Sequence, residues 1–296
     1  MSKKGYGTAA AITVSIIWGL SFVAASMVLT TLSPVILATV RFIIAAVIYS
    51  PIIILEYHRG NKPTLADMKE LALFGFLSIS IYFWLQYTGV QYAGAGVSAV
   101  LVTGLIPVLT GIAGAVLLKE RFNLNRGLGI ALGLTGVSLI ALPKLIVSNV
   151  DWRFFVGVAC LLGNAVCWSM YSTLSRRLMK RIGKPLMVTA YTTLWGMLFL
   201  LPMSLTSDWG ALSALTVNQW GSILYLAVIC SGGGYLLWNY ALSKTEAVRA
   251  SVWLYLEPVA AFIGSFALFG IVPLFLTLLG GATILLGALL ISLSKQ

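Results

Sequence analysis

The feature that most constrains this chain is a succession of long apolar runs separated by short polar gaps. A helix needs about 20 apolar residues to cross the hydrocarbon core of a bilayer, and ten runs of the sequence approach that length. We predict spanning helices at residues 7–29, 35–55, 71–90, 96–118, 127–142, 154–174, 186–205, 220–242, 247–269 and 274–293. The sequence therefore predicts an all-α integral membrane protein with ten transmembrane helices.

The composition agrees with a membrane protein and excludes a soluble domain. Only 9% of the residues are charged and 59% are hydrophobic, whereas a soluble domain carries about 25% charged residues. The mean hydropathy is +0.98. The formal net charge of +11 does not indicate a nucleic-acid partner, because the basic residues lie in short gaps between apolar runs and form no basic domain.

The Lys and Arg residues are distributed unequally between alternate gaps, and short cytoplasmic loops hold the excess in membrane proteins. With ten spans and the N-terminus inside, sixteen of the 19 basic residues fall on the inner side and two, Lys144 and Arg153, on the outer side. The remaining one, Arg41, lies within the second span. We therefore predict that both termini are cytoplasmic. The first apolar run, 7–29, is longer than the apolar core of a signal peptide, so we expect no cleavage there.

The two halves of the chain repeat the same order of marked residues. Trp18 precedes Trp168 by 150 positions, and Pro107 precedes Pro258 by 151. Each half contains five predicted spans, an odd number, so the second copy would be inverted in the membrane. Inverted repeats around a site near the bilayer midplane are a transporter architecture. The alternative is that both halves look similar only because both are hydrophobic.

A second similarity joins the aromatic run of residues 82–87 (YFWLQY) to that of residues 235–240 (YLLWNY). We therefore predict one five-helix repeat over residues 1–145 and a second over residues 150–296, which together form one transport unit. A chain with this internal pseudo-symmetry needs no partner copy, and we expect a monomer.

Four short motifs in this order resemble the drug/metabolite transporter superfamily, EamA type. They are Trp18-Gly19-Leu20-Ser21-Phe22, Arg41-Phe42, Leu118-Lys119-Glu120-Arg121 and Leu256-Glu257-Pro258. Within that group the chain resembles bacterial amino-acid exporters, notably those of aromatic amino acids. The resemblance implies a protein of the bacterial inner membrane that moves a small metabolite outward by alternating access.

The chain departs from this family at one place. After the ninth span the family often has a Gly-Glu pair that matches Lys119-Glu120, but here the sequence is Gly270-Ile271-Val272-Pro273. We therefore interpret Glu120 as a solvated charge at a helix end.

Polar and aromatic residues share single helical faces, because residues three and four apart are neighbours on a helix. Trp and Tyr offer an apolar face with a hydrogen-bonding tip, and an ammonium group can rest on such a ring. The alternatives are ordinary packing or an aromatic belt at the membrane surface. The residues predicted to bind substrate are Trp18, Ser21, Tyr82, Gln86, Asn164, Trp168, Tyr171, Trp238, Asn239, Trp253 and Glu257.

Arg41 and Glu257 are charged residues within predicted spans, which are costly unless paired, hydrated or functional. One hypothesis is that Glu257 accepts a proton or the amine of the substrate, while Arg41 holds a carboxylate. The alternative is that each is neutralised by its neighbours and only joins helices. Arg41 lies about 10 Å from the outer end of its span, so it could also extend outward to the surface.

Three positions could bend the helices. Pro107 and Pro258 lie inside predicted spans, where proline removes a backbone hydrogen bond. Gly233 is the middle of three consecutive glycines, and glycine weakens a helix by about 1 kcal/mol relative to alanine. Gly233 therefore marks either a hinge or a point of close packing.

The sequence offers little for covalent chemistry. Its only histidine, His58, lies in a basic loop, and we interpret Cys160, Cys167 and Cys230 as small buried side chains. No residues have metal-ligand spacing, and we predict no metal, no cofactor and no enzymatic activity.

The prediction is an exporter of amino acids and related metabolites through a central aromatic cavity. The alternatives are export of another metabolite or of a drug, a membrane-embedded enzyme that modifies lipids, and a ligand sensor without transport. A nucleotide sugar would need more basic residues than Arg41 in the cavity.

Overall fold

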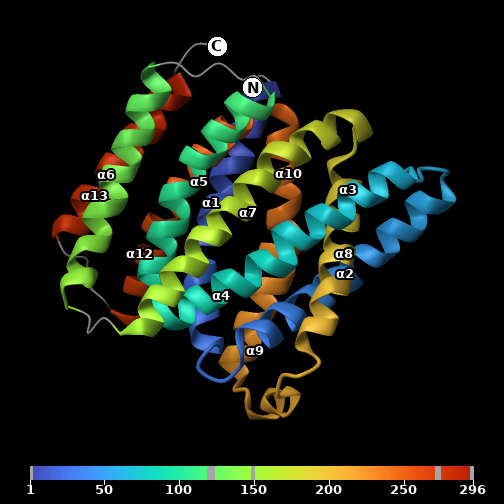
Figure 1. The fold of residues 1–296 in the computed structure, drawn as a ribbon, viewed down its shortest axis with the longest axis horizontal. Helices are drawn as coiled ribbons and strands as arrows, with labels where there is room; N and C mark the ends of the chain where they lie inside the picture. The colour runs from blue at the N-terminus through green and yellow to red at the C-terminus, as the bar shows by residue number, and fades with distance from the viewer. Residues whose placement is uncertain (1–2, 119–123, 148–150, 271–274, 294–296) are drawn as a thin grey trace.

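The computed structural model describes residues 3–118, 124–147, 151–270 and 275–293, and within these ranges helices joined by short turns and loops form the fold, with no strand (Figure 1). Eight helical stretches are long and apolar enough to cross a membrane. They are Gly5–Val28, Pro34–His58, Leu65–Ala93, Val97–Gly114, Trp152–Ile182, Pro185–Ser204, Val217–Lys244 and Ala247–Gly264. These stretches coincide with the predicted spans one to four and six to nine.

The predicted fifth and tenth spans correspond to α6 (Leu124–Val147) and α13 (Phe275–Leu293). These two helices pack side by side along one edge of the bundle (Figure 1). Their backbones approach closely, because a Cβ added to Gly287 would lie 2.5 Å from the carbonyl oxygen of Gly129. Small residues permit such contact between helices in a membrane. That α6 and α13 also cross the bilayer stays a prediction, as does the cytoplasmic location of the termini.

Several helices extend beyond the predicted spans. The helix α7 (Trp152–Ile182) has 31 residues and is therefore about 46 Å long, whereas the hydrocarbon core is about 30 Å thick. Its last turns carry the basic cluster 176–181, which hydropathy alone had assigned to a loop. The other long helices are α1 (Lys3–Val28), α2 (Pro34–His58), α5 (Ala95–Leu118) and α8 (Pro185–Ser204).

The third and eighth spans have the same internal order. The third consists of α3 (Leu65–Gly75), a π-helical segment (Phe76–Ile81) and α4 (Tyr82–Ala93). The eighth consists of α9 (Val217–Leu224), a π-helical segment (Tyr225–Gly234) and α10 (Tyr235–Lys244). π-Helical segments are rare in proteins, and those that occur often lie at functional sites. Hydrophobicity alone therefore does not explain why one recurs at the equivalent place in each half of the chain.

Each of these two spans also begins with a capping box. Thr64 and Asp67 cap α3, and Thr216 and Gln219 cap α9, in both cases through reciprocal hydrogen bonds of the side chains with the backbone. The helices α3 and α9 begin at opposite ends of the bundle (Figure 1). The two halves of the chain therefore present the same starting structure at opposite ends.

The ninth span is interrupted just before its proline. It consists of α11 (Ala247–Ser251), a 3₁₀ turn (Val252–Tyr255) and α12 (Leu256–Phe269), and Pro258 lies in the first turn of α12. Proline cannot donate a backbone hydrogen bond, which explains why the α-helix does not continue through this point. By contrast, α5 continues through Pro107.

Candidate functional site

A narrow cavity lies at the centre of the bundle, between helices of both halves of the chain. Its volume, measured as the space open to the centres of water molecules, is about 20 Å³. This volume is enough for one or two water molecules. The walls come from α1, α2, α4, α7, α10 and α12. The residues that line it are Trp18, Ser21, Phe22, Arg41, Tyr82, Phe83, Gln86, Trp168, Tyr235 and Glu257.

Aromatic rings form most of the wall. Trp18 and Trp168 meet edge to face with ring centroids 5.1 Å apart, and Tyr235 lies 5.7 Å from Trp18 and 5.6 Å from Trp168. Tyr82 lies 5.0 Å from Trp168 on the other side. Each such pair contributes about 0.5–1.5 kcal/mol beyond simple burial. The two tryptophans that the sequence relates as repeats are therefore direct neighbours at the cavity.

Trp18 is fixed by the backbone on both sides. Its Nε1 donates a hydrogen bond to the carbonyl oxygen of Cys230 at 3.1 Å, within the second π-helical segment. A Cβ added to Gly234 would lie 2.6 Å from the same Nε1, so this glycine is required for close packing. A Cβ added to Gly19 would lie 2.4 Å from the carbonyl oxygen of Glu257, so α1 and α12 touch at the cavity.

The carbonyl groups of both π-helical segments accept hydrogen bonds from tyrosines of the other half. The hydroxyl of Tyr235 donates to the carbonyl oxygen of Ser78 at 2.7 Å. The hydroxyl of Tyr49 donates to the carbonyl oxygen of Gly232. The irregular backbone on each side of the cavity therefore joins the two halves of the chain.

Arg41 is directed inward and does not extend to the surface. Arg41 is only 2% exposed. Its Nε donates to Ser231 Oγ at 2.6 Å and its Nη1 to the Tyr87 hydroxyl at 2.6 Å. The guanidinium carbon lies 4.3 Å from the centre of the Phe83 ring. The possibility that Arg41 reaches the membrane surface is therefore wrong, because contacts with α4 and with the second π-helical segment hold it at the cavity.

Glu257 is the second buried charge of the cavity wall and is 6% exposed. Within the described residues, its carboxylate has neither a salt bridge nor a hydrogen bond. Gln86, also predicted as a site residue, lines the same wall. The cavity thus combines one cation, one carboxylate and one amide with several aromatic faces.

Some predicted residues lie behind the cavity wall. Trp238 packs 5.6 Å from Trp18 and 5.7 Å from Trp168. Asn164 donates to the carbonyl oxygen of Tyr82 at 2.8 Å, and its Oδ1 is buried without a hydrogen-bond partner in the described part of the chain. The Nε1 atoms of Trp168 and Trp238 are likewise unpartnered there. Buried polar atoms are usually hydrogen-bonded, and of these three groups only that of Trp168 belongs to a residue of the cavity wall.

Three further predictions lie outside the cavity of this conformation. The hydroxyl of Tyr171 donates to Asn239 Oδ1 at 2.9 Å, and Asn239 Nδ2 donates to Thr189 Oγ1 at 2.8 Å. These two residues therefore satisfy each other and hold α7, α8 and α10 together. Trp253 packs beside the cluster of Ala10, Ala11 and Ala241. Glu120 lies outside the described residues.

The sequence did not predict the residues that position Arg41. Tyr87 and Phe83 lie in the aromatic run that was recognised, and their spacing of four places them on one helical face. Ser231, in contrast, has no distinguishing pattern, because it is one serine beside three glycines, 190 positions from Arg41.

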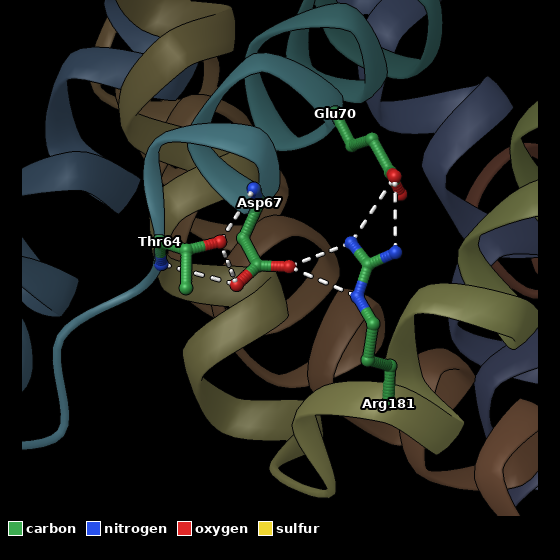
Figure 2. Close-up of polar contacts among 4 residues, drawn as sticks. All are labelled: Thr64, Asp67, Glu70 and Arg181. Carbon is green, nitrogen blue, oxygen red and sulfur yellow. Dashed lines mark hydrogen bonds and ion pairs between the residues drawn. The ribbon is translucent and has the colours of Figure 1, made fainter.

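The two halves also meet at a charged junction, which we call the α3–α7 junction and define as Thr64, Asp67, Glu70 and Arg181 (Figure 2). Arg181 donates to Asp67 Oδ1 from Nε at 3.0 Å and from Nη2 at 2.6 Å, and to Glu70 from Nη1 at 3.1 Å. Asp67 Oδ2 accepts from the Thr64 hydroxyl at 2.7 Å. The Thr64 hydroxyl and the Arg181 guanidinium thus bind different oxygens of the Asp67 carboxylate.

A neutral counterpart lies at the opposite end, which we call the α1–α9 junction and define as Gln219, Met27, Thr30 and Thr31. Gln219 Nε2 donates to the carbonyl oxygen of Met27 at 3.0 Å, to Thr30 Oγ1 at 3.2 Å and to Thr31 Oγ1 at 2.8 Å. Asp67 and Gln219 occupy the same position of their capping boxes. In both halves, this residue therefore caps its own helix and also binds the end of the first long helix of the other half.

A bundle of spanning helices around a narrow aromatic cavity with two buried charges is the construction of a membrane transporter. The profile of the EamA-like transporter family matches residues 5–142 and again residues 155–293. The chain belongs to this family, within the drug/metabolite transporter superfamily. The resemblance inferred from the four motifs is thereby confirmed.

Several relatives are similar over most of the chain. An uncharacterized transporter of Archaeoglobus fulgidus is 30% identical and the match covers 91% of this chain and 92% of that protein. The uncharacterized transporter YyaM of Bacillus subtilis is 31% identical, with 93% and 90% covered. A "Probable terminal-alkyne amino-acid exporter" of Streptantibioticus cattleyicolor is 29% identical, with 78% and 75% covered.

A known crystal structure shares the fold. It matches 97% of this chain and 96% of its own with a TM-score of 0.77, at 20% sequence identity. At that identity the likeness shows the fold alone. The fold, the duplicated family match and the named relatives together define a multi-pass membrane transporter.

Proposed function

We propose that this transporter exports amino acids, including aromatic ones, and related small metabolites across the bacterial inner membrane. The observation that carries the proposal is the central cavity, where indole and phenol rings surround one buried cation and one buried carboxylate. Aromatic faces suit an apolar side chain and can hold an ammonium group. A zwitterion supplies a complement to both charges. The printed name of the Streptantibioticus relative agrees with this class of substrate.

Transport would proceed by alternating access between two inverted repeats, residues 1–145 and 150–296. The cavity has room for one or two water molecules, whereas pockets for small molecules measure about 300–1,000 Å³. The helices must therefore separate before an amino acid can enter. The α3–α7 junction and the α1–α9 junction lie at opposite ends, so we propose that they open in turn as the two gates.

The bending points of this motion would be Pro107, Pro258 and Gly233. The 3₁₀ turn before Pro258 already interrupts the ninth span beside the cavity. Gly233 has nothing within 4 Å of an added Cβ, so close packing does not explain this glycine, in contrast to Gly234. This difference favours a hinge at Gly233.

The predicted residues would divide the work by position. Trp18, Ser21, Tyr82, Gln86 and Trp168 would contact the solute directly, because they line the cavity. Glu257 would accept the amine of the substrate or a proton. A second layer of side chains would support these walls or become accessible when the helices separate, namely Asn164, Tyr171, Trp238, Asn239 and Trp253. The unit would function as a monomer.

The test is counterflow in proteoliposomes that contain the purified chain and a panel of labelled amino acids, with and without a pH gradient. We expect exchange of phenylalanine, tyrosine and tryptophan. Trp168→Ala should abolish most of it, whereas Trp84→Ala, a matched change at a tryptophan that is 41% exposed, should not. Equal rates for the two variants would contradict the assigned cavity.

The same assay tests the role of Glu257. We expect Glu257→Gln to change the rate or its dependence on pH, because the variant cannot take up or release a proton. An unchanged rate and pH profile would end the coupling hypothesis. Exchange of drugs or other metabolites without amino acids would favour the second candidate, an exporter of another substrate class. Modification of vesicle lipids without exchange would indicate an enzyme.

A further inference from the structure

Arg41 is a buried cation for which the described part of the chain provides no anion. Its residue is 2% exposed, and its hydrogen bonds go to two neutral hydroxyl groups. The described residues contain no salt bridge to it, not even with Glu257, which lines the same cavity. An arginine stays charged in a protein, and a charge removed from water without a partner is strongly destabilising.

The guanidinium is held in one orientation. Ser231 binds Nε and Tyr87 binds Nη1, each at 2.6 Å, while the Phe83 ring lies against the guanidinium plane with its centre 4.3 Å from Cζ. Nη2 has no hydrogen bond within the described residues. Guanidinium groups bind carboxylates and phosphates through planar, paired hydrogen bonds. An oriented guanidinium with free donors in a cavity wall is therefore a preformed anion site.

The contacts of Arg41 extend across both halves of the chain. Arg41 belongs to α2, Tyr87 to α4, and Ser231 to the π-helical segment Tyr225–Gly234. The hydroxyl of Tyr87 and that of Ser231 both add dipoles without adding charge, so they orient the cation and leave its charge uncompensated. A merely structural arginine would be expected to meet a carboxylate, because buried charges in proteins are paired.

We propose that Arg41 binds the carboxylate of the transported amino acid and is a specificity-determining residue of this site. The inference rests on the proposed function and narrows its substrate class to solutes that carry a carboxylate, with the aromatic rings and Glu257 available for the rest of the molecule. An aromatic amine of the same shape would leave the guanidinium desolvated without an anion. Sites built to bind one polar group reject the analogue that lacks it by a large factor.

The experiment compares three solutes on the unmodified full chain in proteoliposomes. Phenylalanine, phenethylamine and phenylalaninamide share a ring and an amine, but only phenylalanine has a carboxylate. We expect exchange of phenylalanine, and at least about 100-fold weaker exchange and inhibition by the other two. Exchange of phenethylamine or phenylalaninamide within a few-fold of phenylalanine would overturn the inference and leave the transport function intact.

Variants add a readout that does not require complete loss of function. Tyr87→Phe removes only the hydroxyl that orients Nη1, so we expect a several-fold higher KM for phenylalanine with little change in kcat. Tyr92→Phe, at a tyrosine that is 38% exposed, is the matched control. Arg41→Met should remove the discrimination between the acid and the amide. Retention of that discrimination in folded Arg41→Met would overturn the assignment.

Failure of the proposed function has a separate signature. If no amino acid is exchanged, the ligand-dependent shift of the unfolding temperature is measured with phenylacetate and with phenylacetamide. Stabilisation by the acid alone, lost in Arg41→Met, would support an anion site on Arg41 in a transporter of another substrate class. Equal effects of the acid and the amide would overturn the inference.

Discussion

The charged α3–α7 junction predicts that replacing Arg181 by methionine opens one end of the transporter. The change removes all hydrogen bonds of Arg181 to Asp67 and Glu70 but leaves Asp67 in its capping box with Thr64. Methionine keeps most of the length and the apolar stem. The variant therefore tests the bridge between α3 and α7 without disturbing the start of α3.

The magnitude follows from exposure. The side chain of Asp67 is 12% exposed and that of Arg181 is 46% exposed. Exposed ion pairs contribute about 0.2–1 kcal/mol, and hydrogen bonds to charged groups about 1.5–3 kcal/mol. We therefore expect the free energy that favours the closed conformation to fall by about 1–2 kcal/mol, a value between these limits. Such a loss changes the ratio of open to closed conformations by about 5- to 30-fold. An open population of about 1–5% would then rise to about 5–60%.

Distances between two spin labels measure this ratio. The labels are placed on cysteines that replace the exposed residues Ala66 and Lys180, in a chain whose native cysteines are changed to alanine. We expect Arg181→Met to add a component at longer distance. The matched control is Arg177→Met, which removes the same charge from an exposed position one turn earlier in α7.

Two results would refute this reasoning. If Arg181→Met gives the same distance distribution as the parent chain, the junction does not hold that end closed. If Arg177→Met adds the same long component, the effect comes from the charge of the helix end and not from the bridge. The bridge is partly exposed, so added salt should also increase the open population in the parent chain.

Three further predictions concern the other junction, the second π-helical segment and pH. Gln219→Ala removes the three cross-helix hydrogen bonds of the α1–α9 junction, so an impermeant thiol reagent should modify a cysteine at the buried position Ile223 several-fold faster than in the parent chain. Gly234→Ala should lower the unfolding temperature because its Cβ meets an indole ring, at a cost of about 1–3 kcal/mol, whereas Gly233→Ala should leave it unchanged or raise it. Protonation of the Asp67 carboxyl removes its charge and weakens its bridge to Arg181, and carboxyl groups in model peptides titrate near about pH 4, so the spin-label distances should stay constant from about pH 8 to pH 5 and lengthen only in stronger acid. Lengthening near pH 6 would contradict this.

The sequence predicted most of what depends on local pattern. Hydropathy located the eight stretches that are long and apolar enough to span in the structure, because a bilayer imposes a length on every crossing helix. Helical spacing placed Trp18 and Ser21 on one face and Tyr82 and Gln86 on another, and the structure brings all four to the cavity. The repeated order of tryptophans related Trp168 to Trp18, and in the structure the two rings are neighbours 5.1 Å apart.

What the sequence could not predict depends on how the helices rotate about their axes. A helical face can be recognised, but tertiary packing decides whether it meets the cavity or the layer behind it. Tyr171 and Asn239 illustrate this, because they bind each other at 2.9 Å instead of lining the wall. The π-helical segments add a second obstacle. A π-helical turn contains more residues than an α-helical turn, so faces extrapolated through residues 225–234 no longer align with α10.

The two junctions show how a duplicated scaffold can acquire a direction. Each uses the last residue of a capping box, at the third position of its helix, to reach the end of the first long helix of the other half, but one residue is the charged Asp67 and the other the neutral Gln219. The ionic junction is weakened by salt and by acid, whereas the amide junction responds to neither. The motions that we propose for the two halves would therefore have unequal energies. In a transporter that opens its ends in turn, this inequality would set which end is closed more tightly in the absence of substrate, and it arises from the exchange of Asp67 and its partner Arg181 in one junction for Gln219 and its neutral partners in the other.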